Sequence, residues 1–127
     1  MKKILIILIA TVQSFLLQGQ DFKTSGKLSE IVDYKPLGYS ILDTTSGDLN
    51  RDSYKDMIII YETDPLDEKE PFRPLLIYIG KSDGTLKLTA KNDKVVYSYY
   101  DGGTMGDPLS QVVIKNGYFT VEHYGGT

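Results

Sequence analysis

The acidic residues around position 50 are the part of the chain best suited to chemistry. Four oxygen-bearing side chains occupy the first, third, fifth and ninth positions of one nine-residue stretch: Asp48, Asn50, Asp52 and Asp56. Alternate side chains of a tightly curled loop converge on one centre, and the backbone carbonyl of Tyr54 adds an oxygen at the seventh position. Calcium is a hard cation that prefers roughly six to eight oxygen ligands. The spacing therefore predicts a Ca²⁺ site.

Electrostatics supports the same hypothesis. Carboxylates crowded this closely repel one another unless a cation neutralises them, so the loop loses stability without metal and regains it with metal. The alternative is a solvated acidic turn that holds no ion. Zinc is disfavoured because it prefers His and Cys, and the chain has one His and no Cys. Magnesium is disfavoured because it demands strict octahedral geometry and keeps its water.

The residues that follow the loop separate two known types of calcium site. An EF-hand needs a Glu at the twelfth position, where this chain has Ile59 inside an apolar run. The stretch from Gly47 to Tyr61 instead resembles the calcium loop of FG-GAP and VCBS repeats, Asp-x-Asn/Asp-x-Asp-Gly-x-x-Asp followed by a hydrophobic strand. The resemblance implies a metal loop that joins two strands of a propeller-like blade. Ser53 replaces the usual Gly, and a single copy cannot build a complete propeller.

A second loop is rich in glycine and runs from Gly102 to Pro108. It lacks the Gly-Lys-Ser/Thr ending of a phosphate-binding loop, so a tight turn is expected. Its glycines alternatively allow a ligand to approach the backbone closely. Taken with the stretch from Gly47 to Tyr61, this loop makes the chain similar to a group of small exported bacterial proteins.

The remaining candidates do not form a catalytic pattern. His123 is the only histidine, and no Gly-x-Ser-x-Gly motif supplies a nucleophile for it. Because His123 alternates in phase with Phe119 and Val121, we expect a half-buried histidine on a strand. No catalytic residue and no organic cofactor are therefore predicted.

Three tyrosines precede the glycine-rich loop: Tyr97, Tyr99 and Tyr100. Ordinary packing in a sheet explains them most simply. Exposed tyrosines alternatively favour contact with a sugar or a protein, because a rigid ring carries a polar tip. The expected partner is accordingly an unidentified protein or glycan. A net charge of -3 without a basic cluster argues against nucleic acid.

The first twenty residues have the layout of a secretory signal peptide. Lys2 and Lys3 precede an apolar run over residues 4–17, and residues 18–20 place a small residue near a cleavage point. The run is shorter than the roughly 20 residues of a membrane-spanning helix. We therefore expect a signal helix over residues 1–20 that is removed on export to the periplasm or the exterior, with no stable membrane span afterwards. An uncleaved N-terminal anchor is the alternative.

Residues 21–127 are expected to form one all-β domain: an antiparallel sheet, a propeller-blade-like unit or a small sandwich. Asn116-Gly117 between two β-prone runs is a strong hairpin signal. Gly125-Gly126 directly after a strand indicates that the domain continues beyond Thr127. The β-prone runs have turn residues between them and cover residues 39–45, 57–61, 74–79, 85–89, 95–100, 111–115 and 118–123.

Three functions are compatible with these features. The first is an exported calcium-binding domain with a binding or interaction role. The second is a secreted hydrolase that acts on glycans through loop carboxylates. The sequence does not determine the separation between two carboxylates that such a reaction needs. The third is a structural protein of the cell envelope that holds no metal.

Overall fold

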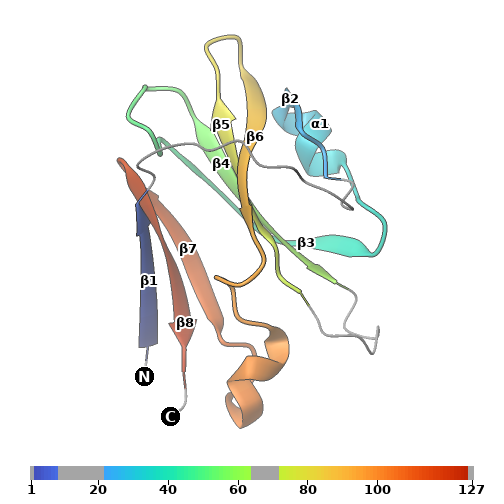
Figure 1. The fold of residues 1–127 in the computed structure, drawn as a ribbon, viewed down its shortest axis with the longest axis vertical. Helices are drawn as coiled ribbons and strands as arrows, with labels where there is room; N and C mark the ends of the chain where they lie inside the picture. Colours follow the sequence, from blue (N-terminus) through green and yellow to red (C-terminus); the bar gives the residue numbers. More distant parts are fainter. Residues whose placement is uncertain (1, 9–21, 64–71, 126–127) are drawn as a thin grey trace.

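The protein consists mainly of antiparallel β-strands in two sheets (Figure 1). A computed structural model of the chain describes residues 2–8, 22–63 and 72–125. The smaller sheet has the order β1-β8-β7, which are Lys2–Leu8, Tyr118–Tyr124 and Leu109–Lys115. The larger sheet has the order β2-β6-β5-β4-β3, which are Ser25–Lys27, Thr85–Asn92, Leu75–Gly80, Asp56–Thr63 and Tyr39–Gly47. Helix α1 (Leu28–Asp33) and the 3-10 helix η1 (Tyr99–Met105) are short, so the all-β prediction is confirmed.

Strand β4 lies inside the larger sheet and is buried on both faces, as its apolar run predicts. Successive side chains of a strand point to opposite faces, so Ile58 and Ile60 enter one core cluster while Ile59 and Tyr61 enter another. The first cluster fills the space between the sheets and includes Phe119 of β8. The second cluster is covered by α1, which contributes Ile31, and by the segment before β2, which contributes Phe22.

The hairpin predicted at Asn116-Gly117 joins β7 to β8. Gly117 has a φ of 91°, a conformation that glycine adopts without the steric cost of a side chain. Val112, Phe119 and Val121 are buried, and Ile114 packs against the same cluster. The predicted buried face of the hairpin is therefore confirmed.

The β-prone run at residues 95–100 does not form a strand. It contains a bend followed by the start of η1. Local hydrogen bonds compete with pairing here, because the Asn92 side chain accepts the backbone N–H groups of Lys94 and Val95. The Asp101 carboxylate likewise accepts the Ser98 N–H at 2.8 Å and begins η1. Tyr99 and Tyr100 consequently lie on η1 and are exposed rather than paired in a sheet.

The N-terminal segment also differs from the expected signal helix. Lys2–Leu8 forms strand β1 and pairs with β8 from Lys2 opposite Tyr124 to Leu8 opposite Tyr118. A run of Ile and Leu suits a strand as well as a helix, and the edge of β8 offers it backbone partners. Cleavage of residues 1–20 stays a prediction, since most of this segment lies outside the described residues. The expected continuation of the domain after Gly125-Gly126 also stays a prediction. No helix within the described ranges is long and apolar enough to span a bilayer.

The Tyr61 hydroxyl provides a test of the second cluster. It is buried without a hydrogen-bond partner among the described residues, whereas the Tyr78 hydroxyl donates to the Lys23 carbonyl at 2.7 Å. An unpaired buried hydroxyl costs free energy, so Tyr61→Phe should raise the free energy of unfolding by about 1 kcal/mol. Tyr78→Phe should lower it by about 1 kcal/mol because a bond is lost. Urea denaturation of both variants measures these changes, and equal destabilisation of the two would contradict this packing.

Candidate metal centre

The predicted calcium loop is the connection between β3 and β4. Gly47 pairs with Asp56 at the end of the two strands, and the residues between them form the loop. Carboxylate oxygens of Asp48, Asp52 and Asp56 lie within 4.8 Å of one another. Their burial increases from the exposed Asp52 through the half-buried Asp48 to the buried Asp56. The structure thus brings together three of the predicted ligands in a group that could hold a metal ion and that opens to solvent on one side.

Backbone N–H groups hold the curl of the loop. The Asp48 carboxylate accepts the N–H groups of Asp52 at 3.2 Å and Ser53 at 2.8 Å. Asp52 Oδ1 accepts the N–H of Tyr54 at 2.9 Å. Arg51 and Ser53 adopt φ angles of 61° and 70°, a left-handed conformation that is uncommon for residues other than glycine. Ser53 stands at the position where FG-GAP and VCBS loops usually have Gly, and it adopts the left-handed conformation that glycine favours.

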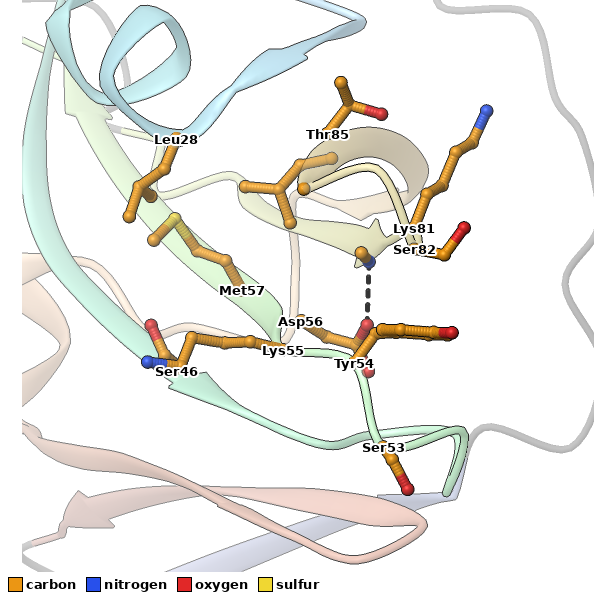
Figure 2. A pocket seen from close by; sticks show the side chains of 13 residues that line it. Leu28, Ser46, Ser53, Tyr54, Lys55, Asp56, Met57, Lys81, Ser82 and Thr85 are labelled. Carbon is orange, nitrogen blue, oxygen red and sulfur yellow. Dashed lines mark hydrogen bonds between the residues drawn. The ribbon is translucent and has the colours of Figure 1, made fainter.

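Asp56 is the buried end of the site, with an exposed fraction of 0%. Its Oδ2 accepts the N–H of Leu49 at 2.7 Å, and its Oδ1 accepts the N–H of Gly80 at 2.8 Å (Figure 2). The carboxylate thereby joins the loop to the end of β5. An ionised carboxylate has about four lone-pair sites, so these two bonds leave capacity for a cation.

The pKa of Asp56 lies above its ordinary value of 3.8. Burial is the main cause, because removal from water disfavours the charged form. The Gly80 and Leu49 N–H groups lower the pKa, while the charges of Asp52 and Asp48 raise it further. The site therefore combines desolvation with an unfavourable negative field, and a bound cation would relieve both.

Contacts below the loop hold it against the rest of the domain. Leu49 is fully buried in the core between the sheets. The Arg51 guanidinium donates to the Asn116 carbonyl at 3.3 Å, at the turn between β7 and β8. Both sheets consequently contribute to the position of the acidic group.

Two further predicted ligands lie on the exposed side of the same loop. Asn50 and Tyr54 are both exposed, and Tyr54 was expected to contribute its carbonyl rather than its ring. The oxygens that converge in the structure belong to Asp48, Asp52 and Asp56. Asn50 and the Tyr54 carbonyl stay predicted ligands.

His123 is a buried strand histidine, more enclosed than expected. Its Nε2 accepts the backbone N–H of Tyr97 at 3.1 Å, and the two rings stack with centroids 4.2 Å apart. Burial lowers the His123 pKa, and the nearby Arg73 lowers it further. These contacts give His123 a role in packing, and its Nε2 is already occupied by the hydrogen bond from Tyr97.

Arg73 is a residue that the sequence analysis missed. Its side chain is 2% exposed and donates to both carboxylate oxygens of Asp107 at 2.6 Å, and to Glu62 at 3.3 Å. It also donates to the Tyr97 carbonyl at 3.1 Å, and it lowers the pKa of Asp107. Arg73 therefore anchors the glycine-rich loop to the end of β4. A lone Arg immediately before the apolar run of β5 is the signal that indicates such a buried ion pair.

Comparison with known proteins identified no relative of this chain. No protein-family model, curated protein sequence or solved structure matches it. The site is consequently described from its own geometry. The resemblance to FG-GAP and VCBS repeats depends on the sequence pattern, which is specific over residues 47–61 and looser over residues 38–46.

Asp56→Asn isolates the titration of the buried carboxyl group. Because the pKa of Asp56 is raised in the folded state, the folded chain binds this proton more tightly than the unfolded chain. In chelator, the stability of the unmutated chain relative to Asp56→Asn should therefore fall as pH rises from 3.8 through the raised pKa. Urea denaturation of both chains across this pH range measures the difference. A difference that stays constant with pH would contradict the burial of an ionisable group here.

Gly80→Ala tests the close approach of the loop to β5. A Cβ atom at Gly80 would overlap the backbone carbonyl oxygen of Lys55, which cannot move as a flexible side chain does. The substitution should lower the free energy of unfolding by about 1–3 kcal/mol. Ser82→Ala, at an exposed neighbouring position, is the control and should change stability little. Thermal denaturation measures both, and equal stability of the two variants would contradict the contact.

Proposed function

We propose that the chain is an exported calcium-binding β domain in which the metal stabilises the connection between β3 and β4. The observation that carries this proposal is the convergence of three carboxylates within 4.8 Å, with Asp56 fully buried. Repulsion between these groups disfavours the folded loop, and a divalent cation would turn the same charges into a stabilising contact. The acidic loop is proposed to be a single unit of the FG-GAP and VCBS type.

The donor set fits calcium by its chemistry. Asp48, Asp52 and Asp56 supply hard oxygen atoms, with Asn50 and the Tyr54 carbonyl proposed to complete the shell. The backbone N–H bonds to the carboxylates position them without using all their lone pairs. Exported calcium modules bind in the range of about 10⁻⁴–10⁻³ M, and a site half open to solvent is consistent with this range.

The biological role proposed for the domain is binding of a protein or glycan in the periplasm or outside the cell. Export is supported by the charged and apolar layout of residues 1–20. Exposed aromatic side chains on η1 support a contact surface: Tyr99 and Tyr100 lie at 51% and 61% exposure. Calcium would act structurally, by holding the β3–β4 loop in place.

Calcium titration of the full chain tests the proposal. Isothermal calorimetry should show binding of one calcium ion, and the free energy of unfolding should rise by about 1.4 kcal/mol when calcium is about tenfold above its dissociation constant. Asp52→Ala should abolish the heat and the stabilisation, because Asp52 is exposed and its loss removes a ligand without opening the core. Asp33→Asn removes one exposed charge from α1 and should leave both unchanged.

Absence of heat and of stabilisation in the unmutated chain would contradict the proposal. The third function compatible with the sequence, a structural envelope protein that holds no metal, would then be favoured. Equal loss of calcium binding in Asp52→Ala and Asp33→Asn would indicate that calcium is attracted by the overall negative charge of the chain and is not bound at this loop.

A further inference from the structure

Two buried side chains hold the ends of the η1 segment, which runs from Tyr97 to Asp107 and includes η1. At its start, the Tyr97 N–H donates to His123 Nε2 and the Tyr97 carbonyl accepts a bond from Arg73, both at 3.1 Å. At its end, Arg73 binds both carboxylate oxygens of Asp107. No residue of η1 between these ends is buried. The position of the segment therefore depends largely on His123 and Arg73.

The hydrogen bond from Tyr97 fixes the protonation state of the His123 ring. An imidazole nitrogen that accepts an N–H carries no proton, so His123 is neutral and its proton is on Nδ1. Protonation of Nε2 would set two donors against each other at the 3.1 Å separation of this contact. The hydrogen bond could not form between them, so the charged ring is incompatible with the observed position of the Tyr97 backbone.

The surroundings of His123 also disfavour a charged ring. Burial holds the His123 pKa below its ordinary value of 6.5, and the permanent charge of Arg73 lowers this pKa further. Asp107 and Asp101 act in the opposite direction. Asp107 is already paired with Arg73, however, and Asp101 accepts a backbone N–H at the start of η1. Two further cations line a pocket that His123 also lines: Lys3 and Lys94.

We propose that His123 is a pH-sensitive latch on the η1 segment. Neutral His123 holds Tyr97 against β8, and protonation of Nε2 releases Tyr97 and loosens the segment. His123 is the only histidine, and histidine is the side chain that ordinarily changes charge between about pH 5 and 8. Tyr99 and Tyr100 lie on η1 and move with it. The latch does not depend on calcium, whereas its effect on a ligand rests on the contact surface of the proposed function.

Hydrogen exchange of the Tyr97 amide, followed by NMR on the full chain in chelator, tests the latch. An imidazole freed by opening has an ordinary pKa of about 6.5, so the equilibrium constant for opening should rise up to about tenfold from about pH 7.5 to about pH 5.5. After correction for the chemical exchange rate, the protection of the Tyr97 amide should fall by the same factor. The Leu88 amide, which donates to the Thr24 carbonyl at 2.8 Å in the other sheet, is the control and should keep its protection.

His123→Gln separates the latch from other titrations. The Gln amide oxygen can accept the Tyr97 N–H but does not titrate, and the raised pKa of Asp56 is retained. Protection of the Tyr97 amide should then stay constant over this pH range.

Imidazole ¹⁵N shifts of the unmutated chain provide a readout that needs no variant, and so decide the question even where the substitution unfolds the chain. Nε2 should become protonated only below pH 6.5, in step with the loss of Tyr97 protection. A His123 that titrates at or above this pH, or Tyr97 protection that falls equally in both chains, would overturn the proposal.

Discussion

The burial of one carboxylate determines how this domain is held together at its acidic end. Asp56 lies at the first position of β4, where its two oxygens accept the N–H groups of Leu49 and Gly80. These bonds join the β3–β4 loop and β4 to the end of β5, the central strand of the larger sheet. They satisfy backbone groups that would otherwise be buried without partners. Their cost is an anionic group removed from water, which the raised pKa of Asp56 expresses.

That cost explains why the loop around Asp56 suits a cation. Asp48 and Asp52 add negative charge to a site that already disfavours it, while backbone N–H groups only partly offset the repulsion. A divalent ion among these oxygens would neutralise the field and bind only the folded loop, which couples metal binding to stability.

The sequence predicted the features that depend on local pattern. The doubly buried run of β4 and the Asn116-Gly117 hairpin follow from alternation and turn chemistry, and both are confirmed. The prediction of a strand at residues 95–100 was wrong, because hydrogen bonds to the side chains of Asn92 and Asp101 outweigh the β propensity of this run. The ion pair of Arg73 with Asp107 was missed, because it forms only when two segments distant in the sequence meet. Spacing indicated the acidic cluster, but it could not show that Asp56 is buried and bonded to Gly80.

The most direct measurement is a crystal structure of the chain grown with calcium, with anomalous scattering used to locate the ion. We predict one calcium peak within about 2.3–2.6 Å of oxygens from Asp48, Asp52 and Asp56. We also expect the Gly80 N–H to donate to Asp56 in the bound form, as it does here. A structure in which these carboxylates point apart into solvent, with no peak between them at saturating calcium, would contradict the proposed calcium site.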